Sequence, residues 1–350
     1  MTESILYLAH TDESGTALPK AVFETLGGAL ELAKQLGAPL DIGLIGENVQ
    51  FAADLLANAG ARRVLGVAGA DFAKPRFASD AAAAEAVCRA TSPSLILAPG
   101  TSRFSRALPS LAQRLHGQVD THITSVEAQE GKISATRWFY RQRLEGVLER
   151  DVRPWILLLD SGCHEPWSGA PGCGQWGKVA VALPPEAMRT TVMGIRAPKT
   201  DAQTIRPDSG LLFVAGAGWT KKQPDGKAHP EKAESLILDF LHASGASLGG
   251  SKSLVDQSGE NQAVLGFMTH MNQVGQTGST PRHPKGLSTC CHGEEPHVVG
   301  WRFINERRAI NLDPNCGWAR GKADVLYVAD AFQVMEKVNT LLATSVAASK

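Results

Sequence analysis

The sequence lacks the features that mark several large classes of protein. Its 35 basic residues are balanced by 35 acidic ones, so a broad electrostatic surface for nucleic acid or an anionic membrane is not expected. No apolar run approaches the roughly 18 residues of a membrane-spanning helix, and the first residues lack the basic and apolar segments of a secretory signal. Six cysteines in 350 residues are too few for a disulfide scaffold. We therefore expect a soluble protein of the cytoplasm with reduced thiols.

Common catalytic motifs are also missing. The sequence contains no G-x-x-x-x-G-K-[ST] and no H-E-x-x-H. Cys290, Cys291 and His292, with His297 and Cys316 downstream, fit no common zinc spacing, so we favour thiols near a ligand pocket over a metal site. An enzyme that uses Cys290 or Cys291 with His292 is an alternative, although the two glutamates that follow oppose a reactive thiolate.

Residues 1–116 alternate short apolar segments with helical ones. The expected strands are 5–9, 40–45, 63–67 and 94–99, and the expected helices are 19–37, 48–58, 79–90 and 102–116. Pro19 begins the first helix and Gly37 ends it, and Ser79 is a candidate N-cap of the third. Repeated β-α units with apolar strands predict a parallel sheet that is covered by helices on both faces.

The pattern changes after Gly117. Four strands with short turns are expected at 122–126, 132–140, 143–150 and 155–159, and an antiparallel extension of the parallel sheet is the simplest arrangement. An aromatic and basic cluster accompanies them, formed by Trp138, Tyr140, Arg141 and Arg143. This cluster is either a solvated face or a surface for a partner subunit.

A second α/β region follows a stretch rich in proline and glycine. We divide the chain into an N-terminal α/β domain (1–160), a loop and linker (161–209) and a C-terminal domain (210–350). The C-terminal domain is predicted to contain strands at 211–215 and 324–329 and a helix at 231–244. Residues 271–322 are polar and long for a structureless stretch, which is typical of a binding surface.

Three segments of this second region are candidates for binding a nucleotide. Gly216-Ala217-Gly218 follows a strand, as a phosphate-binding turn should, although taken alone the segment favours a plain strand-to-loop turn. The loop from Asn272 to Ser279 offers glycines, hydroxyls and amides that suit a phosphate or ribose, and otherwise is a polar surface loop. Asn311 and Asp313 follow a short strand, either at a nucleotide-binding edge or in an Asx turn.

The order of these pieces resembles the alpha subunit of electron transfer flavoproteins. The resemblance covers roughly residues 1–160 and 210–340, and it rests on Val119–Val126, Ser251–Asp256, Gln273–Gly278 and Ala309–Pro314. Gln-Val-Gly-Gln-Thr-Gly at 273–278 corresponds to the flavin loop of that family and is the strongest single match. The resemblance implies a doubly wound C-terminal domain that binds FAD.

The resemblance also implies a function. Alpha subunits of this family pair with a beta subunit, and their FAD carries electrons from a flavin-linked dehydrogenase to a quinone oxidoreductase or similar acceptor. Such a protein is an electron carrier rather than an enzyme. The residues that the resemblance places at the cofactor are Gly216, Gly218, Ser251, Lys252, Gln273, Val274, Gly275, Gln276, Thr277, Gly278, His292, His297, Asn311 and Asp330.

The resemblance assigns different parts of the cofactor to different residues. Gln276, Thr277 and Gly278 would contact the flavin or its ribityl chain, and His297 would lie near the pyrimidine edge. Ser251 and Lys252 would lie near the isoalloxazine. Asn311 and Asp330 would bind the adenosine-diphosphate half, and Asp330 is also a candidate N-cap of the closing helix, whose expected apolar stripe is Val334, Met335, Val338, Leu341 and Leu342.

Three departures from the family pattern point to an alternative. Gly218 and Lys252 each stand where the family has arginine, and lysine keeps the charge without the planar fork. Glu294, Glu295 and Pro296 lie in a turn that normally offers backbone N–H groups to a phosphate. The alternative is an assembly subunit that kept the fold and lost the flavin.

Overall fold

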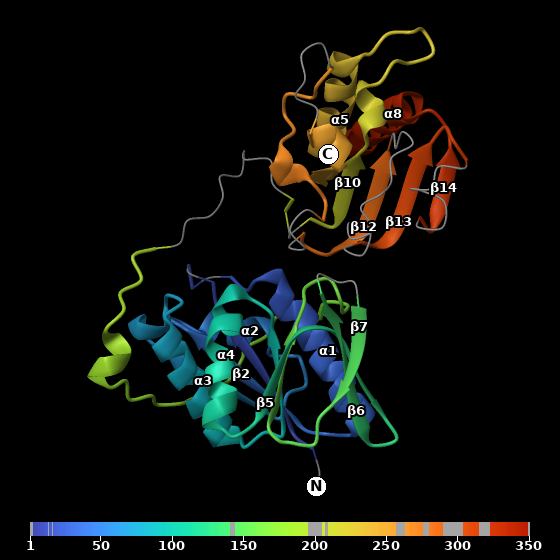
Figure 1. The fold of residues 1–350 in the computed structure, drawn as a ribbon. Coiled ribbons are helices and arrows are strands. Elements are labelled where there is room, and N and C mark those ends of the chain that lie inside the picture. The colour runs from blue at the N-terminus through green and yellow to red at the C-terminus, as the bar shows by residue number, and fades with distance from the viewer. Residues whose placement is uncertain are drawn as a thin grey trace. The chain divides into compact units, whose positions relative to one another are not determined.

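The computed structural model describes residues 3–12, 14–15, 17–140, 144–194, 205–206, 209–256, 263–275, 280–289, 304–314 and 323–348. Residues 345–348 are described by their backbone alone. The chain divides into two compact units, the first taking in residues up to Arg196 except for 141–143, and the second residues from Ala197 onward. Each unit is an α/β structure built on its own sheet (Figure 1). The predicted fold class is confirmed.

In the first unit, nine strands of the described chain form one sheet in the order β7-β6-β5-β8-β4-β1-β2-β3-β9. Its parallel part consists of β1 (Ile5–His10), β2 (Leu40–Gly46), β3 (Arg63–Ala68), β4 (Leu95–Pro99), β8 (Trp155–Leu159) and β9 (Gly177–Lys178). β5 (Gln118–Gln129), β6 (Lys132–Phe139) and β7 (Leu144–Glu149) add an antiparallel extension. The extension is confirmed for these three strands.

Strand β8 does not belong to that extension, contrary to the sequence prediction. It lies between β4 and β5 and runs parallel to both. All five of its residues, Trp-Ile-Leu-Leu-Leu, are buried. A continuous apolar run is typical of a strand with both faces covered in a parallel sheet, whereas a strand with one solvated face alternates apolar and polar residues.

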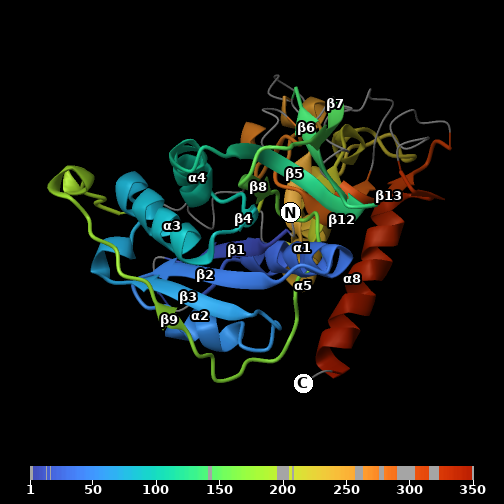
Figure 2. The ribbon, with the colours of Figure 1, turned by 90° about the horizontal axis from the view of Figure 1, so that it is seen from below.

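Helices cover the parallel sheet on both faces (Figure 2). The helices α1 (Lys20–Leu36) and α2 (Gln50–Leu55) pack on one face, where Tyr7 and Leu97 are buried against Leu26. The helices α3 (Phe77–Thr91) and α4 (Ser102–Arg114) pack on the other, where Leu8 is buried against Phe104. The predicted two-sided cover is confirmed, because successive residues of each strand point to opposite faces and both sets are apolar.

Ser79 is not the N-cap of its helix. The helix α3 begins at Phe77 with Arg76 as the N-cap residue, so Ser79 lies within the first turn. Its hydroxyl donates to the Arg76 carbonyl at 3.3 Å, which is the local bond that serine forms inside helices.

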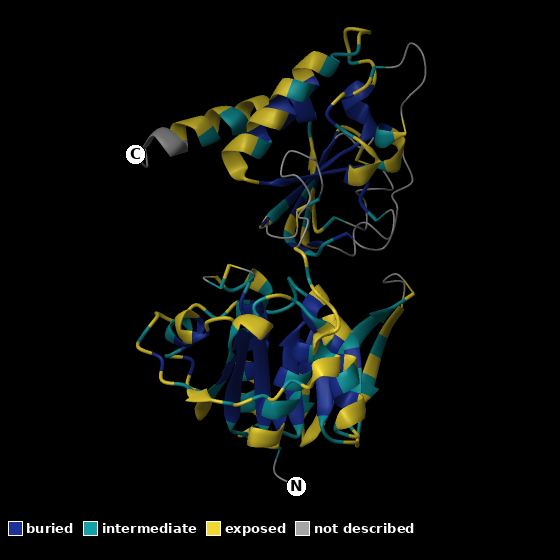
Figure 3. Cartoon of the chain, turned by 90° about the vertical axis from the view of Figure 1, so that its left-hand side faces the viewer, coloured by how far each residue is buried: buried dark blue, intermediate teal, exposed yellow. Residues whose placement is uncertain are grey.

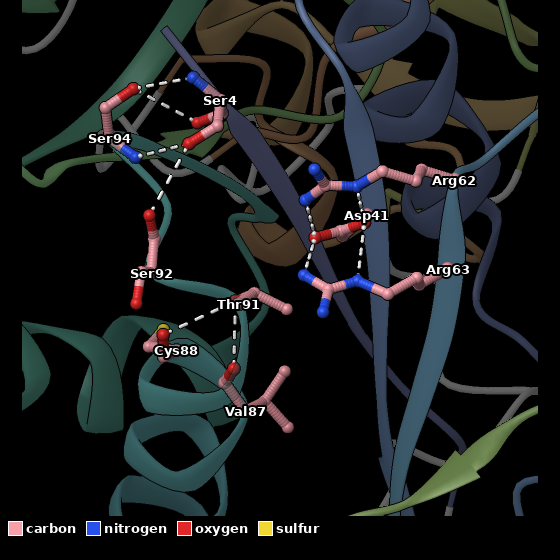
Figure 4. Close-up of polar contacts among 9 residues, drawn as sticks. All are labelled: Ser4, Asp41, Arg62, Arg63, Val87, Cys88, Thr91, Ser92 and Ser94. Carbon is pink, nitrogen blue, oxygen red and sulfur yellow. Dashed lines mark hydrogen bonds and ion pairs between the residues drawn. The ribbon is translucent and has the colours of Figure 1, made fainter.

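Polar clamps fix the amino ends of the strands in this unit (Figure 4). The carboxylate of Asp41 accepts hydrogen bonds from Arg62 and Arg63, each with one bond of 2.7 Å. Burial alone would raise the pKa of Asp41, but the hydrogen bonds from both arginines lower it. Ser4 and Ser94 bond reciprocally through their backbone N–H groups and hydroxyls, at 2.8 and 3.2 Å. These contacts set the register of neighbouring strands.

The irregular segment after β8 lies on the first unit and is called the strap here (residues 161–176). Ser161 and Gly162 both donate to the Glu24 carboxylate, at 2.7 and 2.8 Å. Further along, the Trp167 N–H donates to the Phe23 carbonyl at 2.9 Å. The strap leads directly into β9, which pairs with β3 at the edge of the sheet. This segment is therefore held to the surface of α1 and to one edge of the sheet.

Two adjacent glycines in α1 let the strap approach the helix. A Cβ atom on Gly27 would lie 2.1 Å from the Glu165 carbonyl oxygen, and one on Gly28 would lie 3.0 Å from the His164 ring. Glycine within a helix costs about 1 kcal/mol relative to alanine. The close contact with the strap explains why this cost is tolerated at both positions.

In the second unit, five strands of the described chain form a parallel sheet in the order β11-β10-β12-β13-β14. These are β10 (Leu211–Ala215), β11 (Ser247–Gly250), β12 (His283–Thr289), β13 (Ile304–Asn311) and β14 (Val325–Val328). The helices α5 (Pro230–Ser244) and α8 (Ala331–Ala348) pack together on one face, over Phe213 and Ile310. Figure 3 shows buried residues along the central strands of both sheets, which include β1 and β10.

The stretch 271–322 is not structureless, because it contains β12 and β13. The sequences of these strands, His-Pro-Lys-Gly-Leu-Ser-Thr and Ile-Asn-Glu-Arg-Arg-Ala-Ile-Asn, carry few large apolar residues. Small residues such as Gly286 and Ser288 are buried in β12, and buried small or polar residues leave no hydrophobic periodicity to read.

The closing helix α8 starts as predicted. One oxygen of Asp330 accepts from the Phe332 N–H at 2.8 Å and from the Gln333 N–H at 3.2 Å, so Asp330 is its N-cap. Met335 is fully buried, but Leu341 is 59% exposed. The predicted apolar stripe is therefore wrong at Leu341, which is exposed, whereas Val334, Val338 and Leu342 pack against the core as predicted. No helix in the described residues has the length and apolar character needed to cross a membrane.

Candidate cofactor site

The carboxyl edge of the second sheet contains a topological switch point, where consecutive connections leave in opposite directions. From β10 the chain goes first to β11 on one side and later to β12 on the other. In open parallel sheets, ligands bind outside the carboxyl ends of the strands at this position. We therefore expect a ligand to bind beside the residues that follow β10.

A short 3-10 helix, η3 (Ala217–Thr220), follows β10 and is tied across the end of β12. The Gly216 N–H donates to the Thr289 carbonyl at 2.8 Å, and the Trp219 indole N–H donates to the Thr289 hydroxyl at 2.8 Å. Trp219 is fully buried, and its ring lies 4.5 Å from that of Phe332. The turn is thus rigid, and it brings Gly218 toward the start of α8.

A pocket of about 310 Å³ opens beside this turn. Gly218 and residues 221–224 line one side of it, residues 310–312 at the end of β13 line another, and residues 329–332 at the start of α8 complete it. Three residues that the sequence predicts at the cofactor, Gly218, Asn311 and Asp330, therefore lie around one cavity. They come from three segments that are far apart in the chain.

The two polar side chains of that set are held by backbone groups. Asn311 is 7% exposed, and its side-chain oxygen accepts from the Asp313 N–H at 3.2 Å. This bond forms the Asx turn that was one of the two interpretations of the sequence. Asn311 nevertheless also lines the pocket, so the two interpretations do not exclude each other. Asp330 uses one carboxylate oxygen to cap α8, while its other oxygen forms no hydrogen bond with the described residues. That oxygen can accept from a ligand hydroxyl.

A second group of predicted residues lies beyond β11. The Ser251 hydroxyl accepts from the Leu254 N–H at 3.3 Å as the N-cap of α6 (Lys252–Val255). Lys252 is exposed, and its ammonium lies 3.8 Å from Asp256. The segment 273–275 runs alongside, since Gln273 pairs with Gly250 in a parallel bridge. Ser251, Lys252 and Gln273 thus lie at the same end of the sheet.

The segment Gln273–Gly275 is itself firmly placed. The Val274 N–H donates to the Gly250 carbonyl at 3.1 Å, and Val274 is buried with Leu212 and Ile304. Gly275 has a φ of +79°, which favours glycine, and its N–H donates to the Thr280 hydroxyl at 2.8 Å. The start of the predicted flavin loop therefore lies alongside the end of β11 and is held there by backbone hydrogen bonds.

The two groups share one edge of the sheet but lie apart along it. β11 and β13 are separated by three steps between neighbouring strands, which amounts to about 14 Å at the usual strand spacing. An elongated ligand with a polar end at β13 and another end at β11 fits this arrangement better than a compact one.

Several predicted residues lie outside the described part of the chain. These are Gln276, Thr277, Gly278, His292 and His297, together with Cys290, Cys291 and Cys316. Within the described ranges, no three histidine, cysteine, aspartate or glutamate side chains gather in a way that could hold a metal ion.

Two pocket residues were absent from the predicted set. Lys221 and Lys222 line the cavity directly after η3. Their signal in the sequence is a pair of cations immediately after a strand and a glycine turn, which is where an anionic ligand of an α/β sheet lies. Without the fold, this pair resembles any exposed lysine pair.

The corresponding edge of the first unit is filled by its own side chains. Its switch point lies between β1 and β4, and there the His10 ring contacts the Thr101 hydroxyl at 2.8 Å and packs edge-on against Phe104. Burial lowers the pKa of His10 to about 4, so the ring is neutral. Behind it, Arg103 and Asp80 form a buried ion pair at 2.6 Å.

Comparisons with known proteins give a consistent picture. A model of the electron transfer flavoprotein domain matches residues 8–191. An electron transfer flavoprotein subunit alpha of Syntrophomonas wolfei is 27% identical over 316 residues, which cover 90% of this chain and 92% of the relative. A protein FixB of Clostridium saccharobutylicum is 27% identical over 339 residues, covering 95% and 92%. A protein FixB of Escherichia coli is 25% identical over 256 residues, covering 71% and 74%.

Proposed function

Because the chain belongs to the electron transfer flavoprotein family, we propose that it is the alpha subunit of a heterodimeric carrier and that its second unit binds FAD. The observation that carries this proposal is the pocket around Gly218, Asn311 and Asp330. These residues were selected from the sequence, and the fold gathers them at the edge where parallel sheets bind nucleotides.

The polar groups present fit the two ends of an FAD molecule. Asn311 and the second oxygen of Asp330 can bind the ribose hydroxyls of the adenosine half. Ser251, Lys252 and Gln273 to Gly275, on the far side of the switch point, suit the flavin end. When bound, FAD supplies reversible electron transfer, and the protein positions it and tunes its potential by nearby charge. The exposed ammonium of Lys252 is the cation available near that end.

The proposed role is transfer between proteins rather than turnover of a substrate. No acid–base pair is needed for electron transfer, and none is invoked. The partners that we propose are a beta subunit, a flavin-linked dehydrogenase as donor and a quinone oxidoreductase or similar acceptor. The proposed location is the cytoplasm.

The visible absorption spectrum of this chain, co-purified with its partner subunit, tests the proposal. We expect a yellow complex with one flavin in this chain, which bleaches on reduction with dithionite and recovers in air. A complex that is colourless and also fails to take up added FAD would contradict the proposal. It would support instead the alternative of an assembly subunit without a cofactor, for which Glu294, Glu295 and Pro296 in the expected phosphate turn are the motivating sequence feature.

A further inference from the structure

We propose that Lys221 and Lys222 bind the diphosphate group of the cofactor in the pocket of the second unit. The inference rests on the proposed FAD site and adds two binding residues to it. The diphosphate that joins the two halves of a flavin dinucleotide carries negative charge, so it needs cations or N–H groups around it.

Among the residues that the structure shows lining the pocket, these two lysines are the cationic ones. Position 218 is a glycine, so η3 itself presents no charged side chain to the cavity. The only acidic side chain of the same lining is Asp330, and one of its oxygens already accepts two backbone N–H groups of α8. The described lining thus has an excess of positive charge.

Neither lysine is engaged elsewhere in the described chain. Lys232 pairs with Glu336 at 2.6 Å and Lys252 lies near Asp256, but no ion pair of Lys221 or Lys222 occurs with a residue that the structure describes. Both side chains are exposed. Their ammonium groups are therefore free to meet an anion without first breaking an ion pair.

The backbone that carries the lysines is fixed, although the side chains are not. The Lys221 N–H donates to the Gly218 carbonyl at 3.2 Å, which closes η3. The Gln223 side-chain amide donates to the carbonyls of Gly218 and Lys221, at 3.2 and 2.9 Å, and the Gln223 N–H donates to the Lys227 carbonyl at 2.8 Å. The turn therefore holds both lysines at the mouth of the pocket.

The neighbouring acceptors decide which anion fits. A carboxylate or an isolated phosphate would use the lysines alone. A nucleoside diphosphate uses them together with Asn311 and the second oxygen of Asp330, which can bind ribose hydroxyls across the same cavity. A cavity of about 310 Å³ lies at the lower end of the usual size of ligand pockets and suits part of a dinucleotide.

Binding of ADP and adenosine to the flavin-depleted complex tests the inference by calorimetry. We expect Lys221→Ala/Lys222→Ala to weaken ADP binding by about tenfold to a hundredfold, because losing a hydrogen bond between charged groups typically raises the dissociation constant by that factor. Adenosine binding should not change, because adenosine has no phosphate. ADP affinity should also lose much of its dependence on salt. The variant Lys285→Ala/Lys337→Ala removes the same charge from exposed positions of the same unit that do not line the pocket, and it should bind ADP like the wild type.

Three results would overturn the inference. One is ADP affinity that is equal in the double variant and the wild type. A second is an equal loss for ADP and adenosine, which would indicate distortion of the pocket. A third is a wild-type complex that binds neither ADP nor FAD. If the wild type takes up FAD but the double lysine variant binds ADP as tightly as the wild type does, only the lysine assignment fails. If the wild type binds ADP through the lysines but takes up no flavin, the proposed electron-carrier function fails and the diphosphate site stands.

Discussion

The two units of this chain use the same type of sheet edge in opposite ways. Each has a parallel sheet with a switch point, between β1 and β4 in the first unit and between β10 and β12 in the second. In the first, the buried side chains of His10 and Phe104 and the half-buried Thr101 occupy the switch point. In the second, a pocket lies beside it. The comparison teaches that the fold provides the edge, while the side chains decide whether it can bind a ligand.

The difference can be traced to the residues that end the strands. In the first unit, β1 ends in a histidine whose buried ring contacts Thr101 and Phe104, which follow β4. In the second, β10 ends in Ala215 and continues through Gly216, Ala217 and Gly218, and these small residues leave room. The lysines that border the pocket come only after this turn. We therefore expect changes in the first unit to alter stability and changes at the pocket to alter ligand binding.

The largest expected effect comes from breaking the buried ion pair of the first unit. Asp80 and Arg103 have side chains that are 0% and 4% exposed, and burial raises the pKa of Asp80 in spite of the arginine. Replacing Arg103 by leucine leaves a buried carboxylate without its partner, so we expect a loss of about 3–5 kcal/mol in the free energy of unfolding. Denaturation in urea measures it.

The matched control is Arg89→Leu, which removes an exposed arginine that pairs with Glu85. This change should cost about 0.5 kcal/mol or less. Equal effects of the two substitutions would contradict the view of the first unit as tightly filled. Folded Arg103→Leu protein should still bind FAD, because the change leaves the pocket intact.

The second effect is on the pH dependence of stability. Burial lowers the pKa of His10 from 6.5 to about 4, so below pH 6.5 the unfolded chain takes up a proton that the folded chain refuses. Stability is full above that pH and falls as the pH decreases toward about 4, by about 2 kcal/mol at about pH 5. The free energy of unfolding, measured above pH 6.5 and at about pH 5, should show this loss in the wild type and a smaller loss in His10→Gln. The same loss in both proteins would refute the assignment.

The third effect is on ligand binding in the second unit. Asn311→Ala removes a buried polar group from the pocket, and we expect the dissociation constant of FAD to rise by about tenfold or more. Titration of the flavin-depleted complex, followed by flavin fluorescence, measures it. Asn305→Ala is the control, because Asn305 lies on the same strand but is exposed and does not line the pocket. Equal affinities of the two variants would place the adenosine half elsewhere.

The smallest effect concerns the strap. In a helix without neighbours, Gly27→Ala would stabilise the helix by about 1 kcal/mol. Here the new methyl group would collide with the Glu165 carbonyl. We expect a net destabilisation of about 1 kcal/mol or more and faster cleavage of the strap by proteases. Lys34→Ala, at an exposed site of the same helix, should change stability by about 0.5 kcal/mol or less. A stabilised Gly27→Ala protein would show that the strap yields easily.

The parts of the fold that could be predicted are those in which local sequence and burial agree. Strands such as Ile5–His10 and Leu40–Gly46 are buried on both faces and consist mostly of apolar residues. Strand β12 and the first part of β13 escaped prediction because their positions are filled by small and polar residues, and only the short strand that leads to Asn311 was expected. The strap leaves no periodic signal, since its contacts with α1 are made by backbone groups and two helical glycines.

The candidate site divides in the same way. Asn311 could be selected because it stands at the end of a short strand, and Asp330 because the resemblance to the family places it at the cofactor. That they share a cavity with Gly218 depends on the order of strands in space, which the sequence does not state. Lys221 and Lys222 became candidates only when the fold placed them at that cavity.

Hydrogen exchange of the full chain in complex with its partner, with and without FAD, tests the central claim most directly. The claim is that the edge of the second unit binds the cofactor and the edge of the first does not. We predict that FAD slows exchange in peptides that cover residues 216–224, 311–314 and 329–333. Peptides that cover 8–12 and 100–104 should exchange at the same rate in both states. Protection confined to the first unit, or none in the second, would contradict the account.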